Sequence, residues 1–119
     1  MTQYVQPSYD DQGRLQKIEN LDKDKKVTGY FVYEYGDNNR VKKYSRFDAA
    51  DKLLSYTEFT YDQADNLVKE ATFDAAGKST GYYEYTYYAS GQRRTSTYYD
   101  AEGKIVTSDS FEEETQAQQ

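Results

Sequence analysis

Regularly spaced tyrosines are the side chains of this sequence best suited to binding a ligand. Tyr30, Tyr56 and Tyr82 stand 26 residues apart, and Tyr44 and Tyr98 fall at nearby positions of the same pattern. Flat rings with carboxylates and amides beside them suit sugars or extended peptides, and tyrosine loses little rotamer freedom on binding. We expect these five tyrosines to form a candidate ligand-binding stripe on the mixed, polar face of a sheet. The alternative interpretation is a solvated face whose rings only stiffen the sheet.

Two glutamates are the best candidates for an acid–base pair. Glu58 and Glu84 stand one repeat apart, but a glycosidase needs one carboxyl kept neutral by burial and another kept ionised, in a cleft. A repeating sheet offers no obvious cleft, and the repeat itself supplies these carboxylates. The chain also has no His and no Cys, which removes the commonest general base and any thiolate nucleophile. We therefore expect no catalytic residue and no enzyme activity.

Carboxylates that stand close together in residues 22–24 and 62–66 are the best candidates for a calcium site. A calcium loop of the EF-hand type needs about five spaced ligands and a terminal Glu, which neither segment has. An Asp that opens a tight turn is already explained by hydrogen bonds to its own loop. We expect no metal ion and no cofactor.

Composition limits the possible partners. The 119-residue chain carries a net charge of −6, and its 15 Lys and Arg residues are spread along the sequence, so we expect no nucleic acid partner. The longest aliphatic run is Leu53-Leu54 and residues 1–10 are polar, so we expect no membrane insertion and no signal peptide. Few aliphatic residues and a net charge usually indicate disorder, but 15 tyrosines are strong strand formers. Their positions favour a folded protein.

The sequence repeats every 26 residues. Four positions show the period in all four copies, without an insertion or deletion: Tyr9, Tyr35, Tyr61 and Tyr87; Asp22, Asp48, Asp74 and Asp100; Lys26, Lys52, Lys78 and Lys104; and Tyr33, Phe59, Tyr85 and Phe111. A fixed period of this length is typical of a tandem array of one supersecondary unit.

Each repeat contains two turn signals, which predict two strands per repeat. Asp at the first loop position and Gly at the fourth suit a type I turn closed by a left-handed residue. That left-handed position is occupied in turn by Gly13, Lys25, Asn39, Asp51, Asp65, Gly77, Gly91 and Gly103. Lys25 is the exception, and it predicts a strained or differently closed loop. We expect strands at 3–9, 14–21, 27–35, 40–47, 53–61, 66–73, 79–87, 92–99 and 105–111, the first an edge strand because it contains Pro7.

The loop spacing predicts which residues face each other across neighbouring strands. One set of columns is Tyr9–Leu15–Tyr33, Tyr35–Val41–Phe59, Tyr61–Leu67–Tyr85 and Tyr87–Arg93–Phe111, and a second set is Leu21–Val27, Phe47–Leu53, Phe73–Ser79 and Tyr99–Ile105. We expect both sets to share one core face, with Arg93 stacked on Tyr87. Tyr30, Tyr56 and Tyr82 then lie on the other face of the sheet. Their expected cross-strand partners are Ile18, Tyr44 and Glu70.

These elements predict an all-β protein: an antiparallel up-and-down meander of four tandem 26-residue hairpin repeats. The steady slant of the pairing either coils an open sheet or closes a small barrel, and we expect the open twisted sheet, with the closed small barrel as the alternative. Residues 1–111 form a single β-repeat domain, and residues 112–119 form a disordered, acidic and Gln-rich tail. An open sheet leaves an apolar face uncovered, so a protein partner or a homodimer is expected.

The loop motif resembles that of a known family. Tyr9-Asp10-x-x-Gly13-Arg14-Leu15 is similar to the signature of the bacterial YD repeats, also called RHS repeats. Fainter copies are Tyr61-Asp62 with Leu67, and Tyr35 with Arg40 and Val41, and Tyr99-Asp100-x-x-Gly103-Lys104 matches in the other half of the repeat. The resemblance spans residues 8–111. It implies a β-sheet scaffold without catalysis of its own, in a secreted or cell-surface bacterial context. This sequence departs from the family pattern in two ways: four repeats are too few to enclose another domain, and we expect no toxin or protease domain.

A second resemblance gives the alternative function. Residues 98–106 are similar to the aromatic hairpins of cell-wall- and glucan-binding repeats, in which rings of adjacent units bind choline or sugars, although this chain has no Trp. Our leading hypothesis is a non-catalytic repeat module for protein binding or scaffolding. The alternative is a carbohydrate-binding module for polysaccharide of the cell-wall or glucan type.

Overall fold

The computed structural model describes residues 4–113, which form nine strands and no helix. The strands are β1 (Tyr4–Tyr9), β2 (Leu15–Leu21), β3 (Val27–Tyr35), β4 (Val41–Asp48), β5 (Leu53–Tyr61), β6 (Leu67–Asp74), β7 (Ser79–Tyr87), β8 (Arg93–Tyr99) and β9 (Ile105–Ser110). Each begins and ends within one residue of its predicted bounds. Of the predicted disordered tail, residues 112–119, the first two are exposed and outside any strand, and residues 114–119 lie outside the described residues.

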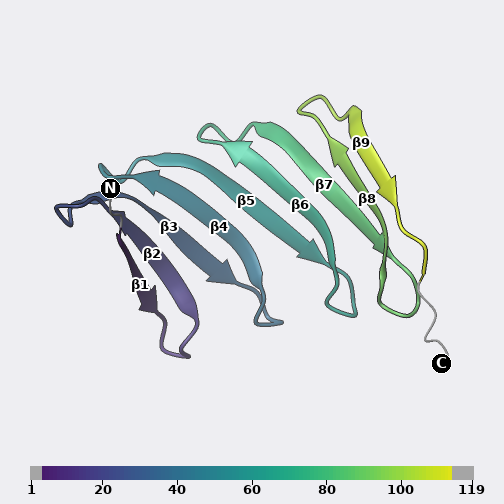
Figure 1. Cartoon of the computed structure of the whole chain (residues 1–119), viewed down its shortest axis with the longest axis horizontal. Coiled ribbons are helices and arrows are strands. Elements are labelled where there is room, and N and C mark those ends of the chain that lie inside the picture. The colour runs from purple at the N-terminus through teal and green to yellow at the C-terminus, as the bar shows by residue number, and fades with distance from the viewer. Residues whose placement is uncertain (1–3, 114–119) are drawn as a thin grey trace.

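All nine strands form one antiparallel sheet in the order of the sequence. Figure 1 shows them side by side in a single twisted layer, with β1 and β9 at opposite ends. The predicted open meander is therefore confirmed, and the sheet does not close into a barrel. Pro7 lies in edge strand β1, as expected.

The loops all close in the same way. In the first loop the N–H of Asp10 donates to the carbonyl of Arg14 at 2.8 Å, and the N–H of Gly13 donates to the carbonyl of Asp10 at 2.9 Å. Six loops open with an Asp whose Oδ1 accepts the N–H groups two and four residues later: Asp10, Asp22, Asp48, Asp62, Asp74 and Asp100. These carboxylates hold their own turns, as the sequence predicted.

Lys25 occupies the left-handed position of its loop with a φ of 65°. Its N–H donates to the carbonyl of Asp22 at 2.9 Å, as in the other loops. The expectation of a differently closed loop is therefore wrong, because the hydrogen bonds of the turn impose the same backbone. The strain is real, since a side chain in this region costs about 1 kcal/mol or more.

Loop stability predicts sensitivity to acid. The backbone N–H of Arg14, helped by its side chain, holds the pKa of Asp10 below its ordinary value. A carboxyl with a lowered folded pKa stabilises the fold above its unfolded pKa of about 3.9, and this contribution is lost as the pH falls below that value. We expect urea unfolding midpoints to fall between pH 5 and pH 3, and Asp10→Asn to reduce that fall. An equal fall in both proteins would contradict the assignment.

A second irregularity follows every loop and was not predicted. Tyr9 pairs with Leu15, but the next residue, Ser8, pairs with Lys17. One residue of β2, Gln16, is therefore extra, which is a one-residue β-bulge. The same shift occurs in all eight strand pairs, and the extra residues are Gln16, Thr28, Lys42, Leu54, Val68, Thr80, Arg94 and Val106.

These bulges correct the predicted faces of the sheet. The predicted pairs beside the loops all form, from Tyr9–Leu15 to Tyr99–Ile105. The two sets do not share a face, because one extra residue between them reverses the alternation of side chains. The predicted outer partners Tyr33, Phe59, Tyr85 and Phe111 are also wrong, since no register pairs them with Leu15, Val41, Leu67 or Arg93. Tyr30, Tyr56 and Tyr82 lie opposite Glu19, Ser45 and Ala71, one residue from the predicted partners.

The single layer has almost no enclosed core. The buried side chains among the described residues are small: Ser45, Thr57 and Ala71 are 5–8% exposed, and no large side chain is fully buried. Gly29 and Gly81 are also buried. On each face of the sheet, rings contact neighbouring rings of that same face. These contacts provide the packing that a second layer supplies in other β proteins.

Candidate functional site: an aromatic face

One face of the sheet, which we call the aromatic face, is covered by rings in contact. At its first cluster Tyr44 of β4 lies between strands β3 and β5, with its ring centre 5.8 Å from that of Tyr33 and 5.9 Å from those of Phe31 and Phe59. The Tyr33 and Phe59 rings are stacked on it and the Phe31 ring is tilted. Such pairs add about 0.5–1.5 kcal/mol each to the area they bury. Tyr44 is the centre of this platform.

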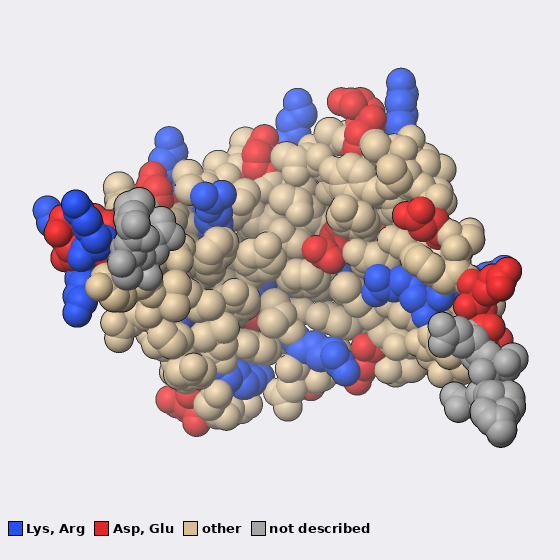
Figure 2. Space-filling model, viewed as in Figure 1, with Lys and Arg blue, Asp and Glu red and all other residues tan. Residues whose placement is uncertain are grey.

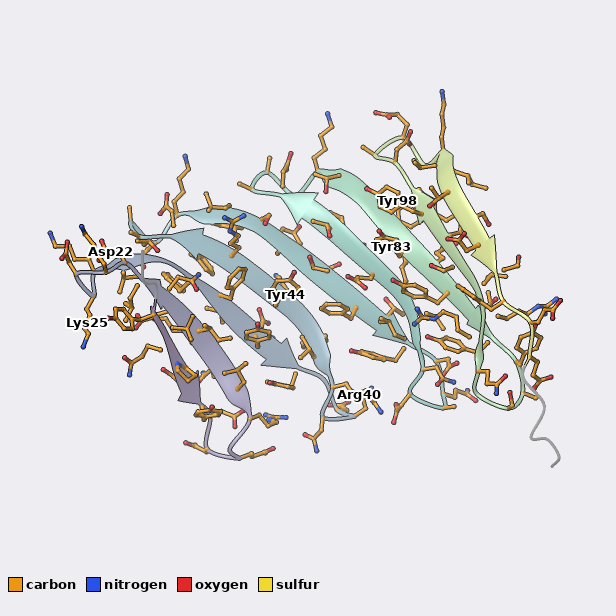
Figure 3. The ribbon with its side chains drawn as sticks, in the orientation of Figure 1. Asp22, Lys25, Arg40, Tyr44, Tyr83 and Tyr98 are labelled. Carbon is orange, nitrogen blue, oxygen red and sulfur yellow. The ribbon has the colours of Figure 1, made fainter. Side chains whose placement is uncertain are left out.

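A second cluster lies on the same face over β7 and β8. The ring centre of Tyr83 is 4.7 Å from that of Tyr98 and 6.0 Å from that of Tyr85. The guanidinium of Arg93 lies 4.0 Å from the centre of the Tyr85 ring and 5.6 Å from that of Tyr87. The predicted stacking of Arg93 on Tyr87 is thus present, and Tyr85 is its closer partner. Figure 3 shows Tyr83 and Tyr98 close together and Tyr44 farther along the sheet.

Tyrosine hydroxyls hold neighbouring hairpins together at the edge of the aromatic face. The hydroxyl of Tyr35 donates to the carbonyl of Leu15 at 2.6 Å, at the end of the seam between β2 and β3 where strand pairing has stopped. Tyr61 and Tyr87 repeat this contact 26 and 52 residues later, with the carbonyls of Val41 and Leu67. The repeated tyrosine of the sequence is therefore a structural bridge.

The opposite face, which we call the charged face, carries three repeated stacks. Lys17 lies 4.4 Å from the centre of the Tyr30 ring, which stacks on Phe47 at 4.9 Å. The equivalent groups in the next repeats are Lys43, Tyr56 and Phe73, and Lys69, Tyr82 and Tyr99. A lysine at one side and a ring at the other leave these tyrosines less surface for a ligand.

The predicted ligand-binding stripe is therefore divided between the two faces. Tyr44 and Tyr98 lie on the aromatic face, opposite Tyr33 and Tyr83 in neighbouring strands. Tyr30, Tyr56 and Tyr82 lie on the charged face, within the stacks. Sequence reasoning did not place Phe31 and Tyr83 in the site, because the bulges that bring them beside Tyr44 and Tyr98 carry no residue signal.

Charge separates the two faces more clearly than ring content does. On the charged face Lys43 lies directly across from Glu58 of the neighbouring strand, and Lys69 lies directly across from Glu84. On the aromatic face the charged side chains at paired strand positions, apart from the Asp residues that open loops, are Arg46, Glu70, Arg93 and Asp109. Figure 2 shows most Lys, Arg, Asp and Glu side chains of the visible surface along the loop edges, with few across its middle.

A shallow depression of about 410 Å³ lies where β4 and β5 separate, beyond their last pair at Lys43 and Glu58. It is lined by Glu34, Lys42, Lys43, Glu58, Phe59 and Thr60. Carboxylates, ammonium groups and one ring here are within reach of a small polar ligand such as a sugar.

The predicted acid–base candidates do not meet. Glu58 lies on β5 and Glu84 on β7, with β6 between them, and their cross-strand partners on β6 are Ala71 and Lys69. Within residues 4–113 no three carboxylates gather closely enough to hold a metal ion. No helix that could cross a membrane occurs in this part of the chain.

Burial gives one tyrosine of the second cluster an unusual titration. Burial, and then the charge and hydrogen bond of Glu70, raise the pKa of Tyr85 to about 12. Its hydroxyl donates to Glu70 Oε1 at 3.3 Å.

A tyrosine whose pKa is raised in the folded state stabilises the fold fully below the unfolded pKa of about 10, and that contribution is lost as the pH rises toward 12. In an absorbance titration we expect the Tyr85 phenolate to form only at high pH, and we expect Glu70→Gln to lower the pH at which it forms. An unchanged titration in that variant would contradict the assignment.

No known family model matches the sequence, and no curated protein is similar enough to be identified as a relative.

Proposed function

We propose that this chain is a non-catalytic repeat module that binds a protein through its aromatic face. One observation carries the proposal: two clusters of contacting rings, around Tyr44 and around Tyr83 and Tyr98, lie on a sheet face that no second layer of residues 4–113 covers. Large uncovered surfaces of this kind mark interaction sites in soluble proteins. The repeat supplies the surface, and the loops supply its rigidity.

The partner is a protein that presents a broad, weakly charged surface with apolar or aromatic side chains. Tyrosine is enriched in protein interfaces because its ring buries much area and loses few rotamers, while its hydroxyl remains hydrated. The described sheet measures 54 × 37 × 34 Å along its principal axes, which is ample for a standard interface of about 800 Å² on each partner. Arg46 and Glu70 are charged side chains of opposite sign on the aromatic face, and they would fix the orientation of that partner.

The aromatic face is the better candidate because of its accessibility. Tyr83 is 40% exposed, and the first cluster carries no lysine on its rings. On the charged face, Lys17, Lys43 and Lys69 lie over the tyrosine rings, and a partner would have to displace their solvated ammonium groups. Burying these ammonium groups under a partner would carry a desolvation cost.

Site-specific photo-crosslinking tests the proposal. A benzophenone side chain in place of Tyr83 reports on the aromatic face, and the same side chain in place of Tyr56 is the matched control on the charged face. In cells that express the chain at its natural level, we expect one defined protein adduct from position 83 and none from position 56. Equal adducts from both positions, or an adduct from position 56 alone, would overturn it.

Carbohydrate binding is the second candidate, and the depression between β4 and β5 favours it. Phe59 and Glu58 line this depression together, and a ring beside a carboxylate is a common way to hold a sugar. Soluble glucan or cell-wall polysaccharide should then change tyrosine fluorescence in the parent chain, and Phe59→Ala should abolish the change. An unchanged signal at saturating polysaccharide would remove this candidate.

The resemblance to YD repeats supports a scaffold context for this module. In the loop that carries the motif, Asp10 accepts two backbone N–H groups and the Arg14 guanidinium at 2.8–2.9 Å, and Arg14 also lies 4.5 Å from the centre of the Tyr35 ring. The residues of the motif thus have structural tasks, as expected of a scaffold. We propose that the chain serves in a bacterial surface or secreted repeat scaffold.

A further inference from the structure

The two edge strands differ in the pairing that their free backbone offers. Directly after β1 the N–H of Asp10 points inward, since it donates to the carbonyl of Arg14, the residue before β2. Backbone groups alternate in direction along an antiparallel strand, so Pro7 faces outward. Proline has no N–H to donate. The free edge of β1 is therefore interrupted at its centre, which is a common protection against pairing with another chain.

The free edge of β9 has no such protection. The N–H of Phe111 donates inward, to the carbonyl of Arg94 at 2.8 Å. By the same alternation Thr107 and Asp109 point inward, and Ser108 and Ser110 present their N–H and C=O groups outward. All six residues of β9 are exposed, and Asp109 is its only charged residue. Ile105 and Val106 at its start are 62% and 55% exposed.

Strand direction limits how a second copy can join this edge. The strands alternate in direction from β1 to β9, so the two edges run the same way. If β9 joined β1 of another copy in the antiparallel direction, the second copy would be turned over. Its charged face would then lie beside the aromatic face of the first copy, and the joint would use the edge that Pro7 interrupts. Joining β9 to β9 about a twofold axis perpendicular to the sheet avoids all three problems.

We infer that two copies of this chain associate edge to edge through β9, as one continuous antiparallel sheet. Ser108 then lies opposite Ser108 of the second copy, with its outward N–H and C=O groups paired. Thr107 lies opposite Asp109 of the second copy on the same face, where a hydroxyl meets a carboxylate and no carboxylate meets another. The aromatic faces of both copies continue into each other. This association uses the sheet edge and does not rest on the function proposed for the aromatic face.

Sedimentation equilibrium of the full chain over a concentration series tests this inference. Ser108→Pro removes one outward N–H and leaves the backbone hydrogen bonds to β8 in place, but it also removes the bond between the hydroxyls of Ser108 and Thr97. Ser108→Ala removes the same hydroxyl bond and keeps the backbone N–H, so it is the matched control. We expect the parent and the alanine variant to form dimers. The proline variant should dissociate with a constant at least tenfold higher.

Amide hydrogen exchange keeps the test decisive if the proline variant does not fold. In the parent chain, raising the concentration should slow exchange at Ser108 and Ser110 and leave Val5 and Tyr9 unchanged. A chain that stays monomeric, a dimer that persists in the folded proline variant, or slowed exchange at Val5 and Tyr9 alone would overturn the inference. Protection of β9 only by an added foreign peptide, without a dimer, would overturn it as well.

Discussion

Replacing Gly81 with alanine should destabilise the sheet by about 3 kcal/mol, the largest effect that we expect from a single methyl group. Gly81 has a φ of 138°, where side chains are strained. A Cβ atom there would lie 2.9 Å from the backbone carbonyl oxygen of Tyr99, and it would overlap the hydroxyl oxygen of Tyr98. The Tyr98 ring can turn aside, but the carbonyl of a paired strand cannot. Urea unfolding of the parent and the variant measures the loss.

Gly91→Ala is the matched control for this experiment. Gly91 also has a positive φ, of 93°, but a Cβ there would meet no atom within 4 Å. Only the backbone strain remains, so we expect a loss of about 1 kcal/mol. If both substitutions cost the same, the carbonyl of Tyr99 does not approach Gly81, and β7 and β8 are not paired as described.

Replacing Tyr44 with alanine should cost about 2 kcal/mol of stability and weaken binding of the partner at least tenfold. Its ring contacts three others, those of Phe31, Tyr33 and Phe59, on two neighbouring strands. Removing it leaves a gap at the centre of the first cluster, and the remaining rings lose their common neighbour. Urea unfolding reports the stability, and titration with the protein captured by photo-crosslinking reports the affinity.

Two variants separate the contribution of the Tyr44 ring from other effects. Tyr44→Phe keeps the ring and should change stability by less than about 0.5 kcal/mol. Tyr9→Ala removes a ring from the same face at the sheet edge, where Tyr9 is 60% exposed, and should also cost little. A loss at Tyr9 as large as that at Tyr44 would mean that ring content, and not the cluster, stabilises this face.

The strands and loops could be predicted because each is marked by residue type. Asp at the first loop position and Gly, Asn or Asp at the fourth have direct backbone tasks, which the structure shows in the hydrogen bonds of Asp22, Asp48 and Asp74. A constant period then fixed the strand lengths between loops. Even Lys25, the one unfavourable residue, adopts the common turn.

The assignment of rings to faces could not be predicted, because no residue type marks the second bulge. The extra positions hold side chains as different as Lys42, Leu54, Thr80 and Val106. A hidden extra residue reverses the alternation that follows it, so the predicted stripe mixed residues from both faces. Two mid-strand glycines were the available signal, since Gly29 and Gly81 indicate a close approach of another group.

Nuclear Overhauser contacts between assigned aromatic rings test the division into two faces most directly, and the proposed function depends on that division. We expect contacts of the Tyr44 ring with the rings of Phe31 and Phe59, and contacts of the Tyr56 ring with that of Phe73. A register without the bulges would instead set Tyr44 directly opposite Tyr56. Contacts between those two rings would show that they share a face, and would contradict the account.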